Sequence, residues 1–138
     1  MSLPKVLAHL RKYPGMHLCP VTYDTSVAFV AGYDAATQRG LLVGFHEWLV
    51  VKLDGGNNLA WPALIRDLMQ CTTPVKELKS PDDHKAAIEF LFATLDQFLN
   101  ERDEWGGMRR IYVAYERWLH RQDWYGPSSP DWIPDDSG

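Results

Sequence analysis

The longest regular pattern of apolar residues begins after Ser80 and continues to about Arg102. Apolar side chains recur there at steps of three and four, which places them on one face of a helix over about five turns. The stripe consists of Ile88, Leu91, Phe92, Leu95, Phe98 and Leu99. Ser80 suits the N-cap, Pro81 suits the first helical position, and the acids that follow favour the positive end of the helix dipole. We therefore predict a core helix.

A second helix is predicted to start after Asp24 or Thr25 and to continue to about Arg39, where Gly40 would end it. Apolar and polar positions do not separate into clear faces here. One side holds Val27, Val30, Ala31 and Asp34, and the other holds Phe29, Gly32, Tyr33 and Ala36. The small residues would let a neighbouring helix approach closely, so we expect this helix at the centre of the bundle. They are Ala28, Ala31, Gly32, Ala35 and Ala36.

Shorter apolar segments complete the pattern, and each is read as a helix. They are Pro4 to Lys12, Gly44 to Lys52, Leu59 to Gln70 and Met108 to Gln122. The run from Leu49 to Val51 is equally compatible with a strand, because periodicity does not settle short apolar runs. Asn58 is the expected cap of the third segment, with Pro62 in its first turn. The inward face of the last segment is expected to be Met108, Ile111, Tyr112, Tyr115, Trp118 and Leu119.

The predicted fold class is mainly α, because strand signals are weak throughout. We expect a single-domain helical bundle of about five to six helices joined by short loops, with an extended C-terminal tail. The helical domain would span residues 1–126, and an extended acidic and proline-rich tail would span 127–138.

Composition agrees with an ordinary globular protein, because 46% of residues are hydrophobic and 23% are charged. No apolar run has the length of a signal peptide or of a bilayer span, so we expect a cytoplasmic protein with no membrane partner. Cys19 and Cys71 lack a paired spacing, and we expect free, partly buried thiols.

The net charge of −4 is unevenly distributed: residues 1–76 carry +2 and residues 77–138 carry −6. An acidic half disfavours nucleic acid and favours a partner with a basic surface. Tryptophan and tyrosine beside charges are typical of protein-binding surfaces. The candidate partner-binding residues are Asp103, Glu104, Trp105, Asp123, Trp124, Tyr125, Asp131, Trp132, Asp135 and Asp136. The terminal aromatic residues could instead fold back onto the body, and the two interpretations are compatible.

Four arginines in the last predicted helix admit two readings. Arg109, Arg110, Arg117 and Arg121 could form an anion site, or they could pair with Glu116, Asp123 and the acidic tail. The surrounding acidity favours pairing.

Motifs for catalysis or metal binding are incomplete. His46-Glu47 resembles the start of a zinc-protease helix, but the second histidine of that motif is replaced by Val50. No serine lies in a nucleophile elbow, and the paired carboxylates lie at helix ends where the dipole explains them. We therefore expect no catalytic residue, no metal ligand and no cofactor. A small enzyme would need a polar pocket, for which His46, Glu47 and Trp48 are the candidates.

A series of short motifs resembles a family of small, poorly characterised bacterial proteins that open with an Arg-Pro-Gly-Met-Tyr-like turn. The motifs are Lys12 to Met16, Gly32-Tyr33, Phe45 to Leu49, Trp61 and the helix from Phe90 to Phe98. Many members of that family resemble the immunity proteins that neutralise polymorphic toxins of neighbouring bacteria. The turn departs from the family pattern, with Tyr13, His17 and Cys19 in place of arginine, tyrosine and glycine.

The resemblance implies a toxin-neutralising immunity protein that binds and occludes a cognate bacterial effector toxin. A basic toxin would be captured quickly by an acidic inhibitor. The alternative is a small regulatory or adaptor module without catalytic activity. In either case we expect a monomer or a weak homodimer.

Overall fold

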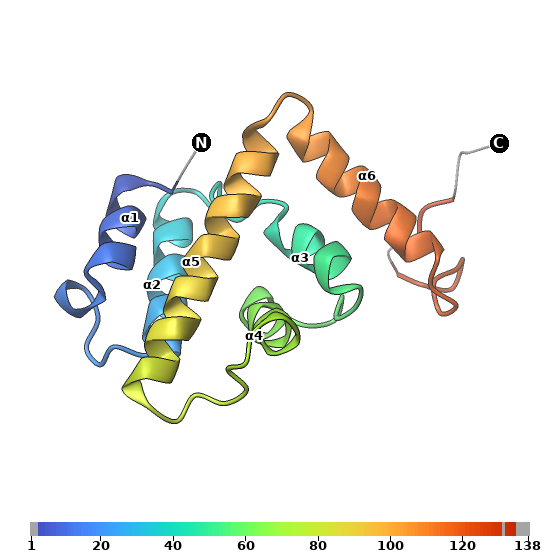
Figure 1. The fold of residues 1–138 in the computed structure, drawn as a ribbon. Helices are drawn as coiled ribbons and strands as arrows, with labels where there is room; N and C mark the ends of the chain where they lie inside the picture. Colours follow the sequence, from blue (N-terminus) through green and yellow to red (C-terminus); the bar gives the residue numbers. More distant parts are fainter. Residues whose placement is uncertain (1–2, 131, 135–138) are drawn as a thin grey trace.

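All of the regular secondary structure is helical in the residues that the computed structural model describes, which are 3–130 and 132–134. No strand occurs in that part of the chain, so the mainly α prediction is confirmed (Figure 1). The elements are α1 (Lys5–Lys12), a single 3₁₀ turn η1 (Pro14–Met16), α2 (Tyr23–Ala36), α3 (Phe45–Leu53), α4 (Trp61–Thr72), α5 (Pro81–Asp103) and α6 (Gly107–His120). The segment from Leu49 to Val51 is helical rather than extended.

The long helix α5 forms the centre of the bundle and contacts each of the other five α-helices (Figure 1). Its predicted cap is confirmed: the Ser80 hydroxyl accepts from the Asp83 amide at 3.1 Å, and the Asp83 carboxylate accepts from the Ser80 amide at 3.0 Å. Every residue of the predicted apolar stripe is buried. Burial of this stripe against several helices stabilises the fold through the hydrophobic effect.

The expectation of a central α2 is wrong. Its main packing partner is α5, through one face that includes Tyr23, Ser26, Val30 and Asp34. The small residues that suggested close helix packing are all exposed: Ala28, Ala31, Gly32, Ala35 and Ala36. Small side chains bury little apolar area, so the face that carries Tyr23 and Val30 is the one that packs.

Two helix starts also differ from the prediction. α2 begins earlier, because Thr22 and Thr25 form a reciprocal capping box in which Thr22 is the N-cap. α4 begins later than expected, at Trp61, and its N-cap is Ala60 rather than Asn58. The chain before it turns at Gly56, whose carbonyl accepts from the Leu59 amide at 2.8 Å.

The turn between α5 and α6 depends on two consecutive glycines. Gly106 has φ of +71°, a conformation that side chains disfavour. Gly107 lies so close to the end of α5 that an added Cβ would be 2.2 Å from the Glu101 carbonyl oxygen. The two helices therefore leave this turn at a fixed angle, and α6 packs on α3 and α5.

The predicted inward face of α6 is only partly correct. Ile111, Trp118 and Leu119 are buried, and Met108 and Tyr115 are partly covered. Tyr112 is 41% exposed, because α6 is covered on one side only and this residue lies at the edge of the covered stripe. Cys19 and Cys71 are free as expected, but both are exposed rather than partly buried. Among the described helices, none has the length and apolar character needed to cross a membrane.

Candidate functional site

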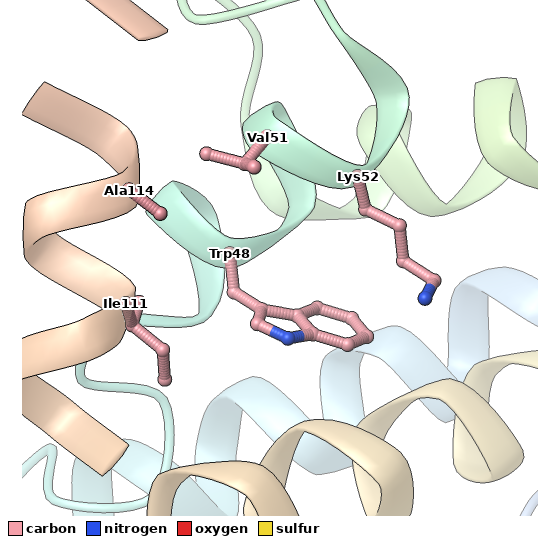
Figure 2. Close-up of a pocket in the computed structure, with 5 residues that line it drawn as sticks. All are labelled: Trp48, Val51, Lys52, Ile111 and Ala114. Atoms are coloured by element: carbon pink, nitrogen blue, oxygen red, sulfur yellow. The ribbon is translucent and has the colours of Figure 1, made fainter. Parts of the chain in front are cut away.

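A cleft lies between α3 and α6 (Figure 2). α3 contributes Trp48, Val51 and Lys52, and α6 contributes Ile111 and Ala114. The cavity has a volume of about 230 Å³, and its lining is apolar apart from the Lys52 ammonium. Space of this kind accommodates one apolar side chain better than a polar small molecule.

The same cleft continues toward the α5–α6 turn. The adjoining hollow, of about 410 Å³, shares Trp48, Val51, Ile111 and Ala114 with the first. Its further lining residues are Glu101, Glu104, Gly107 and Arg110. The cleft therefore has an apolar floor along α6 and charged residues of both signs where it reaches the turn.

Trp48 is fixed in the wall of this cleft. Its indole N–H donates to the carboxylate of Glu101, and the Lys52 ammonium lies 4.8 Å from the centroid of its ring. Phe98 packs against the same ring at a centroid distance of 5.7 Å. Trp48 is consequently only 8% exposed and shapes the cleft without projecting from it.

Trp105 stands at the tip of the α5–α6 turn and is 95% exposed. Its backbone is nevertheless held: Arg110 Nη1 donates to the Trp105 carbonyl at 2.7 Å, and Arg110 Nη2 donates to the Glu104 carboxylate at 2.9 Å. Glu104 and Gly107 border the cleft, so the exposed indole and the cleft belong to one continuous surface. We call this surface, Trp105 together with the cleft and its charged residues, the turn surface.

The other predicted aromatic residues lie at the opposite end of α6, which at 14 residues is about 20 Å long. Trp124 is 52% exposed, and its ring packs against Trp118 at 6.3 Å. The Tyr125 hydroxyl accepts from the Ile133 amide at 2.8 Å, so the described part of the tail returns onto the helix end. Trp132 is partly covered.

The structure thus divides the candidate partner-binding residues into two groups. Glu104 and Trp105 belong to the turn surface, and Asp103 precedes them as the last residue of α5. Asp123, Trp124, Tyr125 and Trp132 lie near the end of α6. Asp131, Asp135 and Asp136 lie outside the described residues. Sequence proximity suggested a single cluster, but the length of α6 separates the two groups.

The expected pairing of the arginines with the acidic tail falls on Asp131, Asp135 and Asp136, which lie outside the described residues. Arg110 pairs with Glu104, whereas Arg109, Arg117 and Arg121 form no ion pair with the described residues. Glu116 lies 3.9 Å from His120 rather than beside an arginine. Arg109, Arg110 and Arg117 line a shallow depression with Val113 and Ala114 on α6. The outer surface of α6 is therefore basic, although this half of the chain is acidic overall.

No set of three or more His, Cys, Asp and Glu side chains among the described residues could hold a metal ion. His46 and Glu47 do not line the cleft beside Trp48, where a polar pocket had been considered. Burial raises the pKa of Tyr23, but its hydroxyl donates to the Pro62 carbonyl at 2.6 Å, which is a structural contact between α2 and α4.

Comparison of the chain with protein-family models, with curated proteins and with solved structures found no match. The geometry of the site is therefore the basis for a functional interpretation. Sequence reasoning missed the cleft, because Trp48 and Glu101 are 53 residues apart and neither belongs to a motif that predicts their contact.

Proposed function

We propose that this protein is an immunity protein that binds a cognate bacterial toxin through the turn surface and occludes it. The observation that carries the proposal is Trp105, whose indole is 95% exposed on a backbone held by Arg110. A tryptophan presented by a rigid backbone loses little entropy on binding, and tryptophan is the residue most enriched among interface hot spots.

The surroundings of Trp105 support protein binding over capture of a small molecule. A single exposed apolar side chain is ordinary on a protein surface. Here, however, the indole stands beside a cleft with an apolar floor and a charged rim, which is the usual anatomy of an interface. A partner could receive Trp105 in a pocket of its own and insert an apolar side chain between Ile111 and Trp48.

The charges refine the expected partner. Asp103 and Glu104 favour a basic surface opposite the turn, as the sequence suggested, whereas the row from Arg109 to Arg117 favours acidic groups opposite the outer face of α6. Complementarity of this mixed kind fixes orientation and raises the association rate. The proposed complex forms in the cytoplasm, with the immunity protein as a monomer or a weak homodimer.

The test is co-expression with the product of the adjacent gene, read by pull-down and by rescue of growth. Wild-type protein is expected to bind and rescue, and Trp105→Ala to lose on the order of 2 kcal/mol of binding free energy or more, as hot spots do. Met16→Ala is the matched control, because Met16 is 72% exposed but lies on η1. Absence of binding and of rescue by the wild type would refute the function. Undiminished binding by Trp105→Ala would refute the assigned surface.

A regulatory or adaptor module would use the same surface for a host protein. A neighbouring toxin gene distinguishes the two functions, because an adaptor does not require one.

A further inference from the structure

Two histidines converge on the surface at α1 and η1, elements that do not line the turn surface. His9 Nδ1 lies 2.6 Å from His17 Nε2, and both side chains are exposed. His9 belongs to α1, and His17 follows η1. In a continuous helix, eight residues would separate the two side chains by about 12 Å along the axis, so the spacing alone does not predict the pair.

The backbone brings the two rings together. η1 reverses the chain after α1, with the His17 and Leu18 amides donating to the Pro14 carbonyl at 3.1 and 2.9 Å. The buried side chain of Leu18 anchors this turn in the core. The His17 ring also packs edge-on against Phe29 of α2, with centroids 5.8 Å apart. Both rings are therefore oriented by the fold, which lowers the cost of gathering them around a ligand.

In the absence of a metal, one imidazole donates the proton of this contact and the other accepts it. We propose that a divalent transition-metal ion takes the place of this hydrogen bond and that His9 Nδ1 and His17 Nε2 form a two-nitrogen site for it. The donating imidazole changes tautomer, so its proton moves to the other ring nitrogen and both ligands are neutral. Imidazole nitrogens are suited to Cu²⁺, Ni²⁺ and Zn²⁺, and water would supply the remaining ligands.

The distance between the nitrogens indicates which ion fits best. Two nitrogens each about 2.05 Å from a metal are about 2.9 Å apart at a right angle and about 3.3 Å apart at a tetrahedral angle. The observed 2.6 Å is closer to the first value. Cu²⁺ and Ni²⁺ favour right angles between their ligands, and Cu²⁺ binds imidazole nitrogens at least as tightly as Zn²⁺ does. These two ions are therefore favoured at this site.

Nearby charges limit the affinity without blocking the site. Arg11 is neutralised by Glu89, to which Nε donates at 3.1 Å. Lys12 remains, with its ammonium 5.3 Å from the Tyr13 ring, and that ring lies 5.0 Å from His9. A like charge at this range weakens cation binding but is screened at an exposed position. Strongly bound ions such as Cu²⁺ and Ni²⁺ are therefore expected, and Mg²⁺ or Ca²⁺ is not, because those ions take oxygen ligands.

The test uses untagged full-length protein, since a polyhistidine tag would bind the same ions. Ni²⁺ is the first probe, because Cu²⁺ reacts with thiols and Cys19 is exposed. In a ¹H–¹⁵N spectrum, substoichiometric Ni²⁺ should broaden the signals around His9 and His17 selectively. Titration calorimetry should show one site, weakened by about tenfold or more in His9→Ala and in His17→Ala. His46→Ala, which removes a histidine outside the pair, should bind as the wild type does.

Copper provides a second readout at the same site. With the cysteines blocked, the electron paramagnetic resonance spectrum of the Cu²⁺ complex should report two imidazole nitrogens in the wild type and one or none in each variant. Unchanged circular dichroism and melting temperature establish that the variants fold. Equal Ni²⁺ binding by wild type and by the His9→Ala/His17→Ala double variant, or broadening confined to other residues, would overturn the site. Neither result bears on the proposed toxin binding, because His9 and His17 do not line the turn surface.

Discussion

The indole Nε1 of Trp118 donates to Oδ1 of Asp54 at 2.7 Å, joining the last turn of α6 to the residue that ends α3. Trp118 is only 2% exposed, so its N–H depends on a protein acceptor. Asp54 has φ of +58°, a backbone conformation that aspartate and asparagine tolerate better than most residues. This one side chain therefore both ends α3 and fixes α6 against it, which holds the two walls of the cleft together.

Asp54→Ala should destabilise the protein by about 1–3 kcal/mol, because it leaves the buried indole N–H unpaired. The strained backbone conformation adds to that cost. Asp54→Asn is the matched control, since an amide oxygen still accepts the hydrogen bond and asparagine adopts the same backbone. Urea denaturation measures the free energy of unfolding of both variants. Equal free energies of unfolding for the two variants would show that the hydrogen bond does not fix α6.

Gly107→Ala should destabilise the protein by about 1–3 kcal/mol or more, because its Cβ overlaps backbone atoms at the end of α5. The nearest are the carbonyl oxygens of Glu101 and Arg102, at 2.2 and 2.5 Å. Gly32→Ala should have the opposite effect and stabilise the protein. No atom lies within 4 Å of its added Cβ, and alanine is the better residue in a helix, so a gain of about 0.5–1 kcal/mol is expected. Thermal denaturation measured by circular dichroism compares the two.

Leu95→Ala should cost about 2–5 kcal/mol, because Leu95 is completely buried and its removal leaves a cavity at the centre of the bundle. Trp132→Ala should cost much less, since this residue is partly exposed and follows the last helix. Chemical denaturation of both variants tests the contrast. A loss from Trp132→Ala as large as that from Leu95→Ala would make the described tail an essential part of the core.

The contribution of Asp83 should depend on pH. Hydrogen bonds from the backbone amides of Ser80 and Lys79, and from the Ser80 side chain, lower the pKa of Asp83 below its ordinary value of 3.8. A depressed pKa in the folded state stabilises the protein above the unfolded-state pKa, and this stabilisation disappears as the pH falls through the folded-state value. Asp83→Ala should therefore lower the melting temperature at pH 7 and have less effect below about pH 4.

The control for this pH dependence is Asp82→Ala. Asp82 lies in the same first helical turn, but its carboxylate forms no hydrogen bond with the described residues. Asp82→Ala should lower the melting temperature less than Asp83→Ala does at pH 7, and its effect on the melting temperature should depend less on pH. A melting-temperature difference between wild type and Asp83→Ala that stays constant from pH 7 to pH 3 would contradict the assigned role of the carboxylate.

Local sequence signals predicted α5 almost to the residue, because its cap, its proline and its apolar period all agree. Where the local signals were weaker, the observed helix starts differ from the predicted ones. Thr22 rather than Asp24 or Thr25 precedes α2, and Ala60 rather than Asn58 precedes α4. The exposure of the small residues of α2, which we expected to pack against a neighbouring helix, has another cause. Ala28 and Gly32 are compatible with a tight helix contact, but only the position of the other helices determines whether a partner is present.

The sequence by itself determined the helices and the buried stripe of α5, because caps and a 3.6-residue period are properties of neighbouring residues. It also identified Trp105 as a candidate anchor. Only the tertiary structure decided that this indole is exposed, that Trp48 and Ile111 form a cleft beside it, and that His9 meets His17. Such relationships join side chains from separate helices, and they depend on how those helices pack, which no local pattern encodes.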